Sequence, residues 1–417
     1  MELYYSFSVL IVLASIFSYL NIRYLKLPST IGVMLIAMFV SIALVVVGNI
    51  YPKLLVNFSE IFKDVDFTEV LMGAMLNFLL FAGAIHINLA DLREQKTPVI
   101  VFSSVSVVIS TFAIGSILFY LLPYLAINLP FIYCLLFGAL ISPTDPIAVL
   151  GILKGANVPK SLETKVAGES LFNDGVAVVV FAVILELTKG SDIDISFSNI
   201  SWLFIKEAFG GLFLGAVLGL SSAYFMRRVD DYKVSVLITL SIVMGGYLIA
   251  HSVHISGPLT MVAAGLVLGN YGRKEHSISL STKDYLNKFW ELIDEILNAI
   301  LFLFIGFELL LIPKVLDYWQ VGILAVGVVL IARFLSIFIP AKLIPFKEEF
   351  DMPTIRILVW GGLRGGVSIA LALSINHGPH KELIIAITYF VVVFSIVVQG
   401  LTIGKLANRV LSKHGSL

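Results

Sequence analysis

The chain has little cysteine and little charge for its length. Cys134 is the only cysteine among 417 residues, which excludes an internal disulfide and a thiolate metal cluster. This side chain is interpreted as a small apolar filler. Only 13% of the residues are charged, whereas 59% are hydrophobic. Such a composition leaves too little polar surface to cover a water-exposed particle, and it predicts a protein embedded in lipid.

Neither sign of charge is in excess. Lys+Arg and Asp+Glu both number 28, and the formal net charge is +0. Nothing in this balance indicates a nucleic-acid partner, so the information must lie in the position of each charge. Charged tails and long Pro/Ser-rich linkers are also lacking, and residues 1–417 are predicted to form a single membrane domain.

Long apolar runs recur along the chain. Runs that can cross the roughly 30 Å hydrocarbon layer lie near 6–22, 29–49, 68–89, 98–123, 131–153, 164–187, 202–226, 234–253, 256–271, 290–311, 319–343, 354–375 and 381–404. Because lipid offers backbone amides no water partner, each run should be helical. The sequence therefore predicts an all-α membrane protein with about thirteen transmembrane helices, here called spans 1 to 13.

Basic residues alternate between successive loops. One set of loops holds most of them, and the other set has only Lys53, Lys63, Lys189, Lys206, Lys314 and Lys381. The positive-inside rule then places the N-terminus outside and the C-terminus in the cytoplasm. This pattern predicts a multi-pass protein of the cell membrane, surrounded by membrane lipids.

Two pairs of segments resemble each other across the chain. Residues 28–35 resemble 258–265, and 80–83 resemble 304–306. These matches pair span 2 with span 9 and span 3 with span 10. Since the shift is odd, the second copy would enter the membrane from the opposite side, as in transporters built from two inverted six-helix repeats. Chance similarity between apolar helices is the alternative.

The same shift pairs span 5 with span 12, and both contain helix-breaking residues at mid-depth. Span 5 contains Ser-Pro-Thr-Asp-Pro at 142–146, and span 12 contains Gly-Gly-Leu-Arg-Gly-Gly at 361–366. Prolines remove backbone donors and disfavour helix before each ring, and glycines weaken a helix through entropy. Broken helices at matching positions indicate a midplane ion site, although an ordinary kink would explain either break alone.

Several charged residues fall well inside the runs, namely Asp145, Glu169, Asp174, Arg333 and Arg364. An ionised side chain there costs about 2.5–3.5 kcal/mol on insertion scales, so each needs a partner or a water-filled cavity. On a helical span 6, Glu169 stacks over Asn173 and Ser170 stacks over Asp174. One of these pairs can face a cavity while the other faces a neighbouring helix.

A carboxylate pair could form the ion site. Asp145 and Asp174, with the Ser170 hydroxyl and a carbonyl freed near Thr144, would supply hard oxygen ligands for a small cation. Two close carboxylates cannot cheaply both stay ionised, so protons compete with the cation. Competition at one site predicts exchange, in which the cation displaces a proton, the site reorients, and the proton returns.

The buried arginines are predicted to be structural. Arg364 cannot lose its charge, and the simplest hypothesis pairs it with Glu169. The sequence identifies no partner for Arg333. His251 and His254 flank a short outer turn as interfacial residues, with pH sensing as the alternative.

Three segments together resemble the sodium/proton exchanger family of the monovalent cation/proton antiporter superfamily, in its microbial type. These segments are 138–150, 168–175 and 361–366, and the Asn173-Asp174 pair is the most specific motif. The resemblance implies electroneutral Na⁺/H⁺ antiport by alternating access, a role in pH homeostasis, and a homodimer. It also implies an ion-binding core of spans 4–6 and 11–13 (98–187 and 319–404) that moves against a dimerisation part of spans 1–3 and 7–10 (6–89 and 202–311).

The resemblance also implies residue roles. Asp174 matches the essential ion ligand, and Asp145, Ser170 and Thr144 match contributing ligands. Glu169 and Arg364 resemble a structural ion pair, and Asn173 resembles the asparagine that steadies the aspartate in electroneutral members.

Span 3 departs from some microbial members, which carry an acidic residue there near the site. This chain has Phe81-Ala82-Gly83 instead. A ligand from that helix is therefore in doubt.

Other functions remain open at this stage. A K⁺/H⁺ or broad monovalent cation exchanger is possible because no residue pattern defines the cavity size, so Li⁺ and K⁺ stand beside Na⁺. A Na⁺-coupled symporter of an organic anion would need more polar side chains. An intramembrane protease is the enzyme alternative. The His-Glu-x-x-His pattern of a metalloprotease is absent, whereas Asp145 and Asp174 could mimic the dyad of an aspartyl protease. The sequence predicts a non-enzymatic transporter without a cofactor.

Overall fold

The protein is helical along the part of the chain that the structure describes. This computed structural model describes residues 2–48, 70–145, 149–151, 153, 158–188, 197–229, 231–274, 279–311, 315–347, 350–375, 378 and 380–413. Within these ranges there is no strand. The predicted all-α fold class is confirmed. Lys53, Lys63, Lys189, Lys314 and Pro146, which entered the predictions above, lie outside the described residues.

Helices occupy all of the predicted apolar runs. In the first half these are α1 (Glu2–Leu20), η1 (Asn21–Leu25), α2 (Ser29–Gly48), η2 (Val70–Met75), α5 (Leu76–His86), α6 (Leu89–Glu94), α7 (Lys96–Ile100), η3 (Val101–Val105), α8 (Ser106–Leu121), η4 (Leu122–Leu125), α9 (Phe131–Ile141) and α11 (Lys160–Thr188). In the second half they are α12 (Phe197–Met226), α13 (Tyr232–Ser252), α14 (Gly257–Lys274), α15 (Leu280–Leu311), η5 (Val315–Tyr318), α16 (Trp319–Leu343), α17 (Met352–Trp360), α18 (Gly366–Leu373), α19 (Lys381–Phe394), η6 (Ser395–Gln399) and α20 (Gly400–Lys413).

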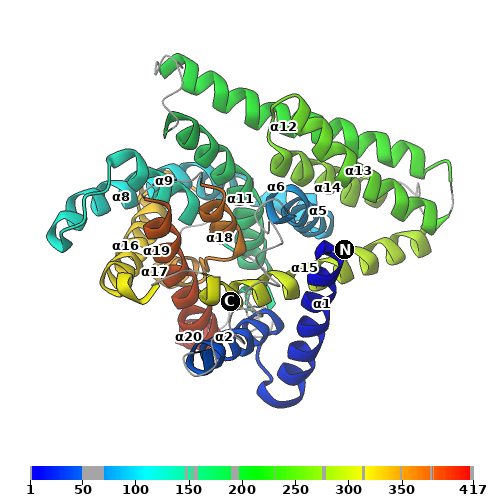
Figure 1. Cartoon of the computed structure of the whole chain (residues 1–417). Coiled ribbons are helices and arrows are strands. Elements are labelled where there is room, and N and C mark those ends of the chain that lie inside the picture. The colour runs from blue at the N-terminus through cyan, green and yellow to red at the C-terminus, as the bar shows by residue number, and fades with distance from the viewer. Residues whose placement is uncertain are drawn as a thin grey trace.

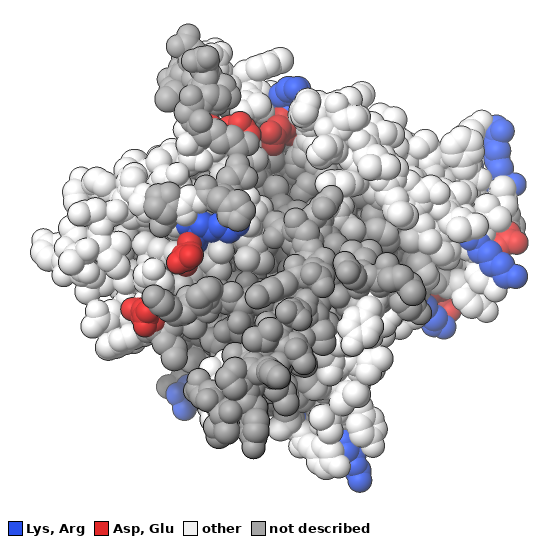
Figure 2. Space-filling view, viewed as in Figure 1, with Lys and Arg blue, Asp and Glu red and all other residues white. Residues whose placement is uncertain are grey.

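The membrane character of the fold follows from length and exposure. Among the described residues, eight helical segments are long and apolar enough to cross a membrane. Large apolar side chains such as Phe39, Trp202 and Phe213 are 66%, 67% and 72% exposed, which suits contact with lipid rather than water. Charged side chains are sparse among the described residues in Figure 2. Three expectations stay predictions: that all thirteen segments cross the membrane, that they form inverted repeats, and that the N-terminus lies outside.

The helices gather into two neighbouring groups (Figure 1). In one group α12 packs on α14, α14 on α5, and α15 on α2. In the other, α8 packs on α9 and on α16, and α16 packs on α19. Trp290 of α15 is fully buried, lies 4.6 Å from the Phe81 ring, and donates to the Thr239 hydroxyl at 3.1 Å. This side chain ties α15 to α5 and α13.

Both predicted helix breaks are present. α9 ends at Ile141 and residues 142–145 are not helical, because Pro143 supplies no N–H. α17 and α18 are separated by the non-helical, glycine-rich residues 361–365. The two interruptions touch, since the Asp145 N–H donates to the Leu363 carbonyl at 2.7 Å. The prediction of broken helices at 142–146 and 361–366 is therefore confirmed over the described residues.

Candidate ion-binding site

Side chains of α11 hold Thr144 within the first break. The Asn173 amide donates to Thr144 Oγ1 at 2.8 Å, and the Thr144 N–H donates to Asn173 Oδ1 at 3.3 Å. The Ser170 hydroxyl donates to the Thr144 carbonyl and lies 2.8 Å from Thr144 Oγ1. These contacts replace hydrogen bonds that the backbone loses where the helix stops. The non-helical segment is therefore fixed to α11.

A cavity of about 70 Å³ lies next to this clamp. It is lined by Leu76, Leu79, Leu80, Gly83, Pro143, Thr144, Asp145, Leu171, Asp174, Asn298, Leu301, Gly365, Gly366, Val367 and Ser368. Since one water occupies about 30 Å³ in the liquid, there is room for an ion with a partial water shell. The side chains of Asp145 and Asp174, which belong to different elements, both line this cavity. This cavity is the candidate ion-binding site.

Three of the four predicted ion ligands line this cavity, namely Thr144, Asp145 and Asp174. Ser170 does not line it, because its hydroxyl is engaged behind Thr144. Ser170 and Asn173, three residues apart, share the helix face toward the first break. The two stacked pairs therefore do not divide as predicted, with one pair facing the cavity and the other facing a neighbouring helix, because Asp174 lines the cavity and Ser170 does not. The position at which residues 142–145 cross α11 decides this arrangement.

Glu169 pairs with Arg333 of α16, not with Arg364. The Arg333 Nη1 lies 2.6 Å from Glu169 Oε1, and both side chains are at least 95% buried. Arg333 also donates through Nη2 to the Leu358 carbonyl at 3.1 Å, near the end of α17. A Cβ at Gly362 would lie 2.5 Å from Arg333 Nε, so this glycine permits the approach. The predicted Glu169–Arg364 ion pair is wrong because α16 brings its arginine closer.

Arg364 instead binds the carbonyl end of α9. Its Nη1 donates to the Ser142 carbonyl and, at 3.0 Å, to the Pro143 carbonyl. The C-terminus of a helix carries partial negative charge on such carbonyls, which a guanidinium stabilises. Arg364, which belongs to the second break, therefore stabilises the first break through these two carbonyls.

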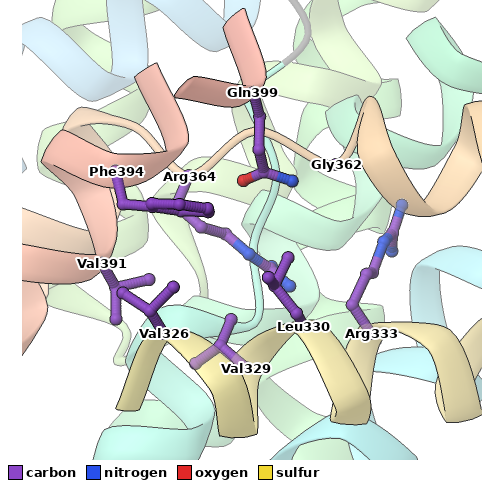
Figure 3. Close-up of a pocket in the computed structure, with 9 residues that line it drawn as sticks. All are labelled: Val326, Val329, Leu330, Arg333, Gly362, Arg364, Val391, Phe394 and Gln399. Carbon is purple, nitrogen blue, oxygen red and sulfur yellow. The ribbon is translucent and has the colours of Figure 1, made fainter. Parts of the chain in front are cut away.

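A hydrogen-bond chain steadies Arg364 from the other side. Its N–H donates to Ser395 Oγ at 2.8 Å, the Ser395 hydroxyl donates to Gln399 Oε1 at 2.7 Å, and the Gln399 amide donates to the Trp360 carbonyl at 3.1 Å. Figure 3 shows Arg364 reaching in from the extended stretch and Arg333 from α16, with Gln399 pointing toward that stretch. The small pocket between them, about 10 Å³, is otherwise lined by apolar side chains. This pocket has space for about one water molecule at most, and its polar residues support the candidate site.

Two polar residues of the cavity wall were not predicted from the sequence. Asn298 of α15 is 3% exposed, and Ser368 of α18 is 1% exposed. Asn298 is a polar residue in the apolar run 290–311, and Ser368 stands shortly after the glycine-rich break; these were the available signals. α5, whose sequence left a ligand from span 3 in doubt, contributes only apolar side chains and Gly83 to the wall.

Comparisons with known proteins find a matching family model and several similar proteins. Residues 10–409 match the family model described as sodium/hydrogen exchanger, transmembrane. The Na⁺/H⁺ antiporter NhaP of Pseudomonas aeruginosa is 49% identical over 406 residues, covering 96% of this chain and 95% of that protein. The Na⁺/H⁺ antiporter NhaG of Bacillus atrophaeus is 36% identical over 376 residues, covering 88% and 70%.

A solved structure has the same fold. The sodium proton antiporter MjNhaP1 from Methanocaldococcus jannaschii superposes with a TM-score of 0.77 at 21% sequence identity. The match covers 98% of this chain and 99% of that one.

Proposed function

Because the chain belongs to the transmembrane sodium/hydrogen exchanger family, we propose that it is a Na⁺/H⁺ antiporter that exchanges one Na⁺ for one H⁺. The observation that carries the proposal is the shared cavity of Asp145 and Asp174, two carboxylates brought together from separate elements. The proposed exchange makes and breaks no covalent bond apart from those to the exchanged proton. We therefore propose a transporter rather than an enzyme, with no cofactor.

The exchange rests on competition for the two carboxylates. Na⁺ is a hard cation that takes oxygen ligands, and Asp145, Asp174 and Thr144 present oxygen atoms to the cavity. Without a cation, two close carboxylates repel, and a bound proton relieves the repulsion. Each ion therefore displaces the other. Asn173 and Ser170 hold Thr144 in place, and the Glu169–Arg333 pair fixes the same stretch of α11 to α16.

Alternating access is proposed to follow from the position of the cavity between two parts. The proposed core (98–187 and 319–404) supplies the polar residues of both breaks and of α11. The proposed dimerisation part (6–89 and 202–311) supplies the apolar residues of α5, together with Asn298 and Leu301 of α15. Movement of the core against this wall, which is apolar except for Asn298, would carry the ligands and open the cavity to the other side.

The membrane placement and assembly are part of the same proposal. We place the N-terminus outside and the C-terminus in the cytoplasm of the cell membrane, on the basic loops. A homodimer is proposed from the family resemblance, with pH homeostasis as the physiological role. The small cavity argues against symport of an organic anion, because sites for such ligands usually measure about 300 Å³ or more.

The proposal is tested with purified protein in liposomes that contain a pH dye and carry an imposed proton gradient. Added Na⁺ should collapse the gradient, and Asp174→Asn should abolish this response while the protein stays folded. Acidification should raise the apparent KM for Na⁺ and leave the maximum rate unchanged, because the two ions compete. A parallel series with Li⁺ and K⁺ determines the cation preference. Absence of a response to every monovalent cation would refute the proposed function.

A further inference from the structure

Ser368 lies in the wall of the candidate ion-binding site and has an unsatisfied hydroxyl. It stands in the first turn of α18 and is 1% exposed, and its Oγ has no hydrogen-bond partner among the described residues. Its side chain lines the same cavity as Asp145, Asp174 and Thr144. A buried hydroxyl without a partner is destabilising, so a native protein that keeps one needs a reason.

We propose that Ser368 is a further ligand of the transported cation, an inference that rests on the proposed function. A hydroxyl has two acceptor lone pairs and one donor hydrogen. Its oxygen can therefore coordinate Na⁺ when the cation is bound. When the site holds a proton instead, the same hydroxyl can donate to a carboxylate. One side chain thus serves both states of the exchange.

The position of Ser368 gives the site a ligand from each broken helix. Thr144 and Asp145 belong to the first break, and Ser368 lies in the first turn of α18, the half-helix that follows the second break. The two breaks are already joined by the hydrogen bond from the Asp145 N–H to the Leu363 carbonyl. A cation bound by ligands from both breaks would hold the two breaks together more tightly. Cation binding and the relative position of the two breaks would therefore depend on each other.

Within the part of the chain that the structure describes, two other serines have buried, unpaired hydroxyls but lie away from the cavity. Ser110 of α8 and Ser235 of α13 are 3% and 1% exposed, and their hydroxyls also lack a partner among the described residues. Neither lines the cavity of the two carboxylates. Ser110→Ala and Ser235→Ala are therefore matched controls for the loss of a buried hydroxyl.

The test compares Ser368→Ala and Ser368→Cys with these controls in the full-length protein. Ser368→Ala should raise the apparent KM for Na⁺ in liposomes by roughly tenfold, as expected for a lost contact to a charged group. Ser368→Cys keeps the size but replaces a hard oxygen by a softer sulfur, and it should behave like Ser368→Ala. Ser110→Ala and Ser235→Ala should keep the KM of the unmodified protein.

A second readout separates binding from structure. A ligand that binds only the folded state raises the unfolding temperature. NaCl, compared with choline chloride, should therefore raise the Tm of the unmodified protein and of both controls, and this increment should shrink for Ser368→Ala. A purely structural role would lower the Tm in both salts and leave the increment intact, which would overturn the assignment.

Ser368→Thr covers the case in which Ser368→Ala folds poorly, because it retains a hydroxyl. It should keep a KM for Na⁺ near that of the unmodified protein, in contrast to Ser368→Cys. Equal KM values for Thr and Cys variants would overturn the assignment. If the unmodified protein exchanges Na⁺ for H⁺ and Ser368→Ala matches it in both readouts, Ser368 is not a ligand and the antiport function stands. If the unmodified protein fails to exchange, the proposed function itself fails.

Discussion

At the residue scale, the buried ion pair of Glu169 and Arg333 shows that a charge inside the helical bundle needs a partner of opposite charge. Both side chains are almost fully buried, and their charged atoms lie 2.6 Å apart. Each charge is tolerated because the other is present, since an unpaired buried charge loses its solvation without compensation. The pair therefore positions α11 against α16 and keeps the backbone beside the site in place.

Arg333→Met is expected to destabilise the protein by about 3–5 kcal/mol, because it leaves the Glu169 carboxylate buried and unpaired. The double variant Glu169→Gln/Arg333→Met should recover much of this loss. Unfolding of the detergent-solubilised protein, followed by circular dichroism against temperature or denaturant, measures both effects.

The control is the exposed pair Lys288–Asp284, whose side chains are 69% and 62% exposed. Lys288→Met should leave the unfolding midpoint unchanged, since water solvates the remaining carboxylate. A single Arg333 variant as stable as this control would contradict the structural role of the buried pair.

At the scale of elements, the two helix breaks depend on close packing against each other. The Asp145 carboxylate packs on Gly365, where a Cβ would collide with it, and α18 begins at the next residue. The N-terminus of a helix carries partial positive charge, which favours a carboxylate nearby. The second break thus helps to position a candidate ligand supplied by the first.

Gly365→Ala is expected to raise the apparent KM for Na⁺ by roughly tenfold or more, because the new methyl group displaces the Asp145 carboxylate from the cavity. The dye-monitored liposome assay measures this change. Gly327→Ala in α16 is the matched control, since a Cβ there meets nothing within 4 Å. Unchanged transport by Gly365→Ala would show that the position of the Asp145 carboxylate does not depend on its contact with Gly365.

At the scale of the whole molecule, the cavity lies between polar residues of the proposed core and a wall from the proposed dimerisation part that is apolar except for Asn298. Asp145, Asp174 and Ser368 belong to the proposed core, and the α5 residues belong to the proposed dimerisation part. Asn173 stands beside Asp174 where a second aspartate would add a further charge. The resemblance of Asn173 to the asparagine of electroneutral members supports the proposed exchange of one cation for one proton.

One-for-one exchange predicts a rate that does not respond to membrane potential. Moving one net charge through 100 mV is worth about 2.3 kcal/mol, so an electrogenic exchanger would respond strongly. Liposomes in which a thiocyanate gradient sets the potential, with Na⁺ and pH held equal between conditions, measure the rate. A rate or final pH gradient that changes with the sign of the potential would contradict electroneutral exchange.

The sequence by itself determined the helical membrane fold, both helix breaks, and the presence of Asp145 and Asp174 within apolar runs. These features depend on local properties, namely the length of hydrophobic runs and the backbone chemistry of proline and glycine. The family resemblance rested on the same local motifs.

Only the tertiary structure decided which buried groups meet. It paired Glu169 with Arg333, turned Arg364 to the carbonyl end of α9, placed Ser170 behind Thr144, and put Ser368 in the cavity wall. Each contact joins segments that are far apart in the chain, and the order of residues along a helix does not state which neighbouring helix its polar face will meet. The packing of α11 against the breaks and against α16 made that choice.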